Sequence, residues 1–220
     1  MKATTEMILK ELSARYSALG AVENDVRAAY EALHACFAKG GRVYLCGNGG
    51  SAADCEHMAG ELLKCFKIKR PMSDDFKAVL SAYGEDGEVL AEHLEGGLPV
   101  VSLTGHVAFS TAFQNDNTPA LVFAQQVNAY GNRGDVLVVF STSGNSKNCI
   151  YATICAKAKG LTVITLTGGS GGKLAPMSDV AITVPAKETY QVQEYHLPVY
   201  HCLCAMLEEE FFGVQEDLIR

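Results

Sequence analysis

Two polar segments of this chain have the composition of ligand-binding loops. Gly47 to Ser51 and Ser141 to Ser146 each follow an apolar run and precede a helical pattern. Glycine lets a ligand approach the backbone closely, and a helix N-terminus offers unpaired N–H groups to an anion. The second segment carries four hydroxyls, more than the one that a helix N-cap requires. We therefore predict that this second segment binds a phosphate group, with a polar capping turn as the simpler alternative; neither segment has the Gly-Lys-Ser/Thr ending of a P-loop.

A histidine and a glutamate lie in the helical segment that the first loop opens. His57 and Glu61 are four residues apart, which places both side chains on one face of a helix. An imidazole and a carboxylate side by side could transfer protons or bind a divalent metal ion. An ordinary pair of surface residues would show the same spacing, so the pair alone leaves both interpretations open.

A second polar group lies near the end of the chain and consists of Gln193, Glu194, His196 and His201. Glu194 and His201 are seven residues apart and nearly align on a helix, and Gln193 lies on the same side. Polar residues on an exposed helix face would give this pattern as well. Pro198 lies within the group, and we expect it to kink the helix or to delay its regular start.

Short apolar runs alternate with helical patterns along the rest of the chain. We expect two helices within residues 3–39, then strands at 43–46, 98–103, 136–140, 161–166 and 180–184, with helices at 51–66, 146–159 and 189–212. Continuous apolar strands that alternate with helices predict an α/β fold with a parallel sheet covered on both faces. The acidic stretch 72–96 interrupts this alternation, and we interpret it as an inserted helical excursion or flexible lid, or as a solvated surface insert.

The amino-acid composition excludes several classes of protein. The 220 residues are 48% hydrophobic, which is enough for one domain with a sizeable core. Eighteen lysines and arginines against 25 aspartates and glutamates give a net charge of −7, which argues against binding nucleic acid or an anionic membrane. No apolar run approaches the roughly 18 residues of a membrane span, and the first residues lack a signal-peptide pattern, so we expect a cytoplasmic protein. The eight cysteines include no C-x-x-C pair, so we expect buried thiols.

Taken together and in this order, the motifs resemble those of the sugar isomerase (SIS) domain family, most closely the phosphoheptose isomerases. The resemblance covers nearly the whole chain and rests on GNGGSAAD with His57 and Glu61, Arg70-Pro71, Asn115-Asp116, GDVLVVFSTSGNS and QE-Y-H-LPVYH. The serine-rich loop marks the broad SIS group, whereas the pairing of Glu61 with His201 is more specific. We expect a single SIS domain over residues 1–220, with N-terminal helices at 1–40, the insert at 72–96 and a C-terminal helix at 189–212.

The resemblance implies a three-layer, flavodoxin-like sandwich with a five-stranded parallel sheet, in a homotetramer with active sites at the subunit interfaces. It implies that sedoheptulose 7-phosphate is isomerised to D-glycero-D-manno-heptose 7-phosphate, with Glu61 as base and His201 as acid. No organic cofactor is implied. A zinc ion in each active site is implied for some members, held at positions matching His57, Glu61, Gln193 and His201. The implied substrate contacts are Asn48, Gly49, Ser51, Asn115, Asp116, Ser141, Thr142, Ser143, Ser146 and Gln193.

The chain departs from the usual pattern of phosphoheptose isomerases in a few places. Thr104-Gly105-His106 stands where an aspartate is usual, Tyr190 stands where another aspartate is frequent, and the insert and Pro198 are unusual. His106 either replaces the missing polar group or is an ordinary loop histidine. These departures leave two alternatives open: an isomerase of another sugar phosphate, and a non-catalytic SIS protein that binds a phosphosugar or a partner. DnaA-binding relatives of the second kind lack the glutamate and the final histidine, which favours an enzyme here.

Overall fold

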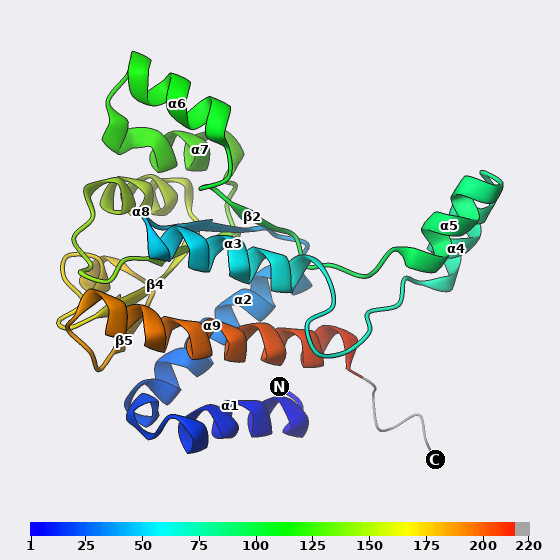
Figure 1. The fold of residues 1–220 in the computed structure, drawn as a ribbon, viewed down its shortest axis with the longest axis horizontal. Helices are drawn as coiled ribbons and strands as arrows, with labels where there is room; N and C mark the ends of the chain where they lie inside the picture. Colours follow the sequence, from blue (N-terminus) through cyan, green and yellow to red (C-terminus); the bar gives the residue numbers. More distant parts are fainter. Residues whose placement is uncertain (214–220) are drawn as a thin grey trace.

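The computed structural model describes residues 1–213, so the last seven residues of the expected domain lie outside the described part. Within that part, one parallel sheet of five strands has the order β2-β1-β3-β4-β5 (Figure 1). The strands are β1 (Val43–Cys46), β2 (Val100–Ser102), β3 (Val136–Phe140), β4 (Thr162–Gly168) and β5 (Val180–Val184). The predicted fold class and strand number are confirmed; β2 is shorter than expected, and β4 starts one residue later and ends two later.

Helices cover both faces of the sheet, as the continuous apolar strands predicted (Figure 1). Val43 and Leu45 of β1 face one layer, whereas Tyr44 and Cys46 face the other, because successive side chains of a strand point to opposite faces. The first layer consists of α1 (Ala3–Arg15), the 3₁₀ helix η1 (Ser17–Val22), α2 (Glu23–Ala38), α3 (Gly50–Leu63) and α9 (Thr189–Phe212). The second consists of α6 (Val107–Asp116), η2 (Pro119–Leu121), α7 (Val122–Tyr130) and α8 (Lys147–Lys159).

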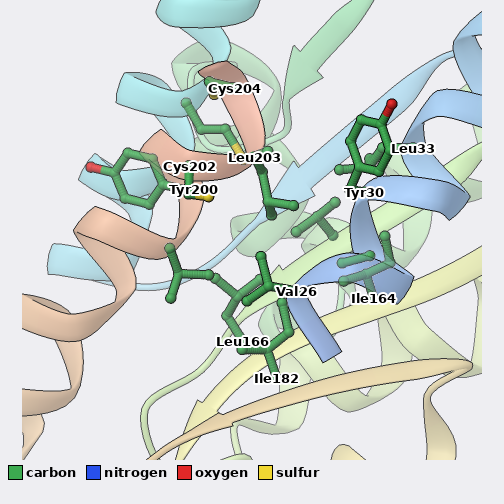
Figure 2. Packing of buried hydrophobic residues seen from close by; sticks show 14 of the residues in the cluster. Val26, Tyr30, Leu33, Ile164, Leu166, Ile182, Tyr200, Cys202, Leu203 and Cys204 are labelled. Carbon is green, nitrogen blue, oxygen red and sulfur yellow. The ribbon is translucent and has the colours of Figure 1, made fainter. Parts of the chain in front are cut away.

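The core of the first layer ties the last helix to the sheet. Figure 2 shows Val26 and Leu33 of α2 packed with Ile164 of β4, Ile182 of β5 and Leu203 of α9.

The sequence did not predict α6 and α7, which fill the long connection between β2 and β3, nor the short η3 (Ala175–Met177). No helix among residues 1–213 is both long enough and apolar enough to cross a lipid bilayer.

The C-terminal helix α9 runs without interruption from Thr189 to Phe212 and contains Pro198. The regular helix therefore begins nine residues before the proline, and the prediction of a delayed start is wrong. Burial explains this outcome: Pro198, Val199 and Tyr200 are all buried, and their packing offsets the one backbone hydrogen bond that the proline removes. The helix therefore carries Gln193 and His201 at ordinary helical spacing.

The insert forms a hairpin of two helices, α4 (Asp74–Ser81) and α5 (Glu85–His93), which projects from the body of the molecule (Figure 1). Its base is closed by a hydrogen bond from the Gly96 N–H to the Arg70 carbonyl, 2.7 Å long. A Cβ on Gly87 would lie 1.9 Å from the Leu80 carbonyl oxygen, so the close approach of the two helices requires glycine there. The predicted helical excursion is confirmed, and its role as a lid stays a prediction.

His196 of α9 is fully buried, and burial lowers its pKa to about 4, with the backbone of Thr167 opposing the shift. Neither ring nitrogen has a hydrogen-bond partner among the described residues. Because the pKa in the unfolded chain is about 6.5, the unfolded state takes up a proton first as the pH falls. We expect the free energy of unfolding to decrease by about 3 kcal/mol between pH 6.5 and pH 4 through this group alone.

The variant His196→Leu should flatten this part of the pH dependence, as measured by urea unfolding at several pH values from 7 to 4. The matched control is His93→Leu, because the His93 side chain is 70% exposed. An unchanged pH dependence in His196→Leu would show that His196 is not the group responsible.

Candidate active site

The two predicted ligand loops meet at one edge of the sheet. They follow β1 and β3, which are parallel neighbours, and the order of the strands reverses between them. Ligands of open α/β sheets bind at such a switch point, outside the carboxyl ends of the strands. Two reciprocal amide hydrogen bonds, 3.0 and 2.8 Å long, join Asn48 in the first loop to Asn148 in the first turn of α8. The two loops are therefore held together by a specific side-chain contact.

Backbone hydrogen bonds from neighbouring segments hold the serine-rich loop in place. The Gly168 N–H donates to the Thr142 carbonyl, and the Leu174 N–H donates to the Gly144 carbonyl, each over 3.0 Å. The Ser141 hydroxyl donates to the Ser146 hydroxyl over 3.2 Å. Ser146 precedes the first residue of α8 but its side chain does not cap the helix. The hydroxyls thus gather beside a helix N-terminus whose first N–H groups stay available to an anion.

A cavity of about 500 Å³ lies beside these loops. Its wall includes Asn48 and Gly49 of the first loop, Lys147 and Asn148 at the start of α8, and Gln114 of α6. Ser51 is buried in the first turn of α3. The predicted contacts Asn115 and Asp116 lie at the end of α6, where they are exposed, hydrogen-bonded to each other over 2.8 Å, and outside the cavity wall. Their role in substrate binding stays a prediction.

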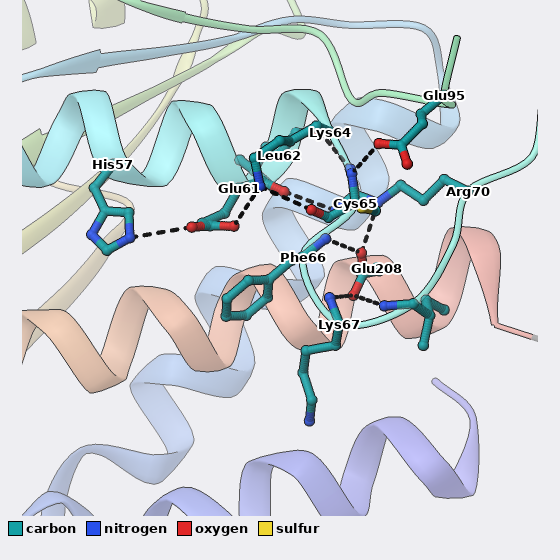
Figure 3. Close-up of polar contacts among 11 residues, drawn as sticks. His57, Glu61, Leu62, Lys64, Cys65, Phe66, Lys67, Arg70, Glu95 and Glu208 are labelled. Atoms are coloured by element: carbon teal, nitrogen blue, oxygen red, sulfur yellow. Dashed lines mark hydrogen bonds and ion pairs between the residues drawn. The ribbon is translucent and has the colours of Figure 1, made fainter. Parts of the chain in front are cut away.

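The structure brings Glu61 and His201 into one cluster, although they are 140 residues apart in the chain. The Glu61 carboxylate lies 3.2 Å from Nε2 of His57 and 3.6 Å from Nζ of Lys64 (Figure 3). The His57 ring in turn meets the His201 ring edge-to-face, with centroids 4.9 Å apart. A carboxylate and two imidazoles are therefore grouped between α3 and α9, as proton transfer requires.

The surroundings of His201 favour its neutral form. Burial, and then the neighbouring His57, lower the pKa of His201, while Glu61 acts in the opposite direction. Its Nε2 atom is buried and has no hydrogen-bond partner among the described residues. The Phe66 ring packs against the His201 ring, with the ring centroids 5.4 Å apart. A neutral imidazole can both accept and donate a proton, so His201 can serve as a shuttle near neutral pH.

Sequence reasoning missed several residues of this cluster. The Tyr200 hydroxyl lies 2.9 Å from Nδ1 of His57 and fixes the orientation of that ring. Phe66 comes from the connection after α3, and Lys147 places a cation on the cavity wall. Tyr200 directly precedes His201, but an aromatic residue on an apolar helix resembles any core residue, so the sequence contains no signal that separates it.

The predicted zinc ligands are grouped only in part. His57, Glu61 and His201 lie together, whereas the Gln193 amide lies against Gly50, where a Cβ would be 2.5 Å from Nε2 of Gln193. No three His, Cys, Asp or Glu side chains within residues 1–213 are arranged around one metal position. The donor types nonetheless fit zinc, and the unpartnered Nε2 of His201 is a buried atom that lacks a ligand.

Two of the departures from the usual pattern lie away from the cluster. His106 precedes α6, and its Nδ1 is 2.6 Å from Oε1 of Gln126 in α7. It lines a separate cavity of about 300 Å³ together with Tyr44 and Tyr130. Tyr190 is 60% exposed at the start of α9. Neither residue contacts the Glu61–His201 cluster.

The two predicted ligand loops and the Glu61–His201 cluster lie at different positions along the length of α3. Ser51 is in the first turn of this helix, and Glu61 is ten residues further on. At 1.5 Å per residue, about 15 Å of helix separates them. Within one chain, the serine-rich loop and the Glu61–His201 cluster therefore lie apart.

Comparison with known proteins agrees with this fold. Residues 9–95 and 97–168 match the SIS domain, and the chain belongs to this family. Among its relatives, the phosphoheptose isomerase of Burkholderia pseudomallei (strain K96243) is 40% identical over 190 residues, which are 86% of this chain and 84% of the relative. That of Thiobacillus denitrificans is 41% identical over 182 residues, 81% of this chain and 80% of the relative.

Solved structures of the same kind of enzyme are also similar. The phosphoheptose isomerase from Neisseria gonorrhoeae superimposes with a TM-score of 0.71 at 33% identity, over 91% of this chain and 94% of that one. The enzyme from Francisella tularensis gives 0.71 at 30% identity, over 95% and 100% of the two chains. The family that the motifs resembled is therefore confirmed.

Proposed function

We propose that this protein is a phosphoheptose isomerase, which converts sedoheptulose 7-phosphate into D-glycero-D-manno-heptose 7-phosphate. The observation that supports this most directly is the grouping of Glu61 with His201 and His57, in a chain about 40% identical to phosphoheptose isomerases. The reaction moves hydrogen from C1 to C2: the C1 alcohol is oxidised to an aldehyde while the C2 ketone is reduced to an alcohol. It needs no outside oxidant, only a base and an acid.

In the proposed mechanism, the Glu61 carboxylate removes a proton from C1. The proton on the resulting carboxylic acid exchanges with water before the acid protonates C2 of the enediol, so in deuterated water C2 acquires deuterium. The neutral His201 ring transfers the second proton between the oxygens on C1 and C2, and it assists the opening of the sugar ring. Tyr200 holds the His57 ring through its Nδ1 atom, and His57 lies against the Glu61 carboxylate. The proton-transfer groups are therefore oriented before substrate binds.

The phosphate is proposed to bind at the serine-rich loop and the start of α3. Neutral hydroxyls and helix N–H groups recognise it without a dedicated arginine. The proposed contacts are Asn48, Gly49, Ser51, Ser141, Thr142, Ser143, Ser146 and Gln193. Of these contacts, Asn48 and Gly49 line the cavity of about 500 Å³. Lys147, which lies on the wall of that cavity, adds a positive charge that the sequence analysis did not include.

We also propose that the active site is completed by a second copy of the chain, in a homotetramer. About 15 Å of helix separates Ser51 from Glu61. A second subunit that supplies either the serine-rich loop or the Glu61–His201 pair would bring both groups to one sugar phosphate.

Zinc is proposed as a metal of this site, held by His57, Glu61 and His201, with Gln193 as a fourth ligand. When bound, it would polarise the sugar oxygens and lower the cost of the negative charge that develops on them. Proton transfer itself is assigned to Glu61 and His201.

The test is exchange of the C1 proton of sedoheptulose 7-phosphate in deuterated water, followed by NMR, with added zinc and with a chelator. We expect aldose product with deuterium at C2. Exchange without product would mean that the base acts on a poorly matched sugar. A folded protein that binds the sugar phosphate but gives neither exchange nor product would refute the proposed reaction and favour a binding protein.

A further inference from the structure

A buried ion pair lies directly behind the Glu61–His201 cluster and is not used by the proposed mechanism. Nε of Arg70 lies 2.8 Å from Oε1 of Glu208, and the two side chains are 0% and 1% exposed. Arg70 belongs to the Arg-Pro motif of the sequence, and Glu208 interrupts a buried apolar stretch of α9. Burying two charges is costly, and apolar residues of the same size often stabilise a fold as well or better. The pair therefore needs an explanation other than stability.

Glu208 holds the connection that follows α3. Its Oε1 accepts the backbone N–H of Phe66 over 2.7 Å, and its Oε2 accepts those of Lys67 and Ile68 over 2.7 and 3.2 Å (Figure 3). Three consecutive N–H groups and Arg70 thus converge on one carboxylate. This fixes the position of Phe66, the residue whose ring packs against His201.

Arg70 holds the end of α3 itself. Its Nη1 donates to the Leu62 carbonyl over 2.7 Å, and its Nη2 donates to the Glu61 carbonyl over 2.8 Å. Carbonyls in the last turn of a helix have no partner within the helix. The guanidinium supplies that partner for the residue that carries the proposed base.

We propose that Arg70 and Glu208 are positioning residues for the isomerase reaction. Glu208 lies seven residues, about two turns, beyond His201 on α9, so the pair joins the Glu61 backbone to the helix that carries His201. The Arg70–Glu208 pair also holds Phe66 in contact with the His201 ring. The acid and the base come from helices far apart in the chain, and this connection sets their separation. The proposal rests on the proposed function, because it assumes that Glu61 and His201 act together.

The test compares Glu208→Gln with a matched control, Asp135→Asn, in the full-length protein. Asp135 is also a buried carboxylate, 5% exposed, and it accepts the backbone N–H groups of Arg42 and Asn132 over 2.8 and 2.9 Å. It lies just before β3, at the opposite end of the sheet from the ligand loops. Both variants lose one buried charge, but only the first loosens the connection between α3 and α9.

We expect Glu208→Gln to lower kcat by about 10- to 100-fold with KM changed less than about threefold, because small displacements of reacting groups cost rate rather than binding. Asp135→Asn should lower the melting temperature but keep kcat within about twofold of the wild type. Both are measured below their melting temperatures with folding verified by circular dichroism. Equal kcat in wild type, Glu208→Gln and Asp135→Asn would overturn the proposal.

If Glu208→Gln does not fold, Arg70→Lys provides the test of the positioning role. Lysine keeps the charge beside Glu208, but it lacks the planar fork that reaches Glu208 and both carbonyls at once. A kcat reduced about tenfold at unchanged KM would support the positioning role, and wild-type kcat would overturn it. Failure of the proposed function is distinguishable, because the unaltered protein would then show no exchange at C1.

Discussion

Glu61→Gln is expected to lower kcat for sedoheptulose 7-phosphate by roughly 100- to 10,000-fold, the usual contribution of a positioned base. Glutamine has nearly the same shape but cannot accept a proton from C1. The Glu61 side chain is only 15% exposed and sits between His57 and Lys64, so the substitution should leave the fold intact. Turnover is measured by NMR, and sugar phosphate affinity by isothermal titration calorimetry.

The dissociation constant for the sugar phosphate should change less than about threefold, because the serine-rich loop supplies the proposed phosphate contacts. Zinc content is measured in parallel, so that loss of a metal ligand is separated from loss of a base. Glu194→Gln is the control: it removes an exposed carboxylate of α9 that lies seven residues before His201 and outside the cluster. Normal turnover by Glu61→Gln would show that Glu61 is not the base.

The sequence contains enough information for the sheet and for the helices that carry the cluster. Strands such as Val136–Phe140 are buried along their whole length, so they read as continuous apolar runs bounded by polar loops. Helices α3 and α9 follow from their spacing. Helix α9 spans the range 189–212 that this spacing predicts, and only the delayed start expected from Pro198 is wrong. His57 and Glu61 could be placed on one face because a single helix fixes their relation.

The missed elements have weak local signals. Helix α6 has no buried residue, so its Phe109 and Phe113, which are only partly buried, do not produce a clear apolar face. Helix α7 is nine residues long and begins directly after the 3₁₀ helix η2. Pro198 misled the expectation for α9, since its tertiary packing outweighs a local preference against helix.

Contacts within the site depend on tertiary structure and could not be derived from spacing. Glu208 and Tyr200 become significant only once α9 lies beside α3, because their partners are Arg70 and His57 on the other side of the interface. The resemblance to SIS proteins supplied the pairing of Glu61 with His201. Without it, a helix pair at 57 and 61 and a polar group near 200 would have remained unrelated.

Gly144→Ala is expected to disrupt the serine-rich loop more than any single hydroxyl deletion. Gly144 has φ of +64°, and a Cβ there would lie 2.0 Å from the Gly171 carbonyl oxygen and 2.9 Å from the Gly172 nitrogen. The left-handed backbone costs alanine about 1–2 kcal/mol, and forcing the two backbones apart costs about 1–3 kcal/mol more. We therefore expect about 2–5 kcal/mol of destabilisation in urea unfolding, and at least a tenfold loss of affinity for the sugar phosphate, which corresponds to 1.4 kcal/mol.

Gly169→Ala is the control that separates the cost of the left-handed backbone from the cost of the steric clash with Gly171. Gly169 lies in the segment that supports the loop and has φ of +60°, but a Cβ there meets nothing within 4 Å. This variant should show only the backbone cost of about 1–2 kcal/mol and keep its affinity for the sugar phosphate. Equal destabilisation and equal affinity in the two variants would mean that the close approach of Gly144 to Gly171 does not shape the phosphate loop. A loss of affinity confined to Gly144→Ala would link that backbone contact directly to phosphate recognition.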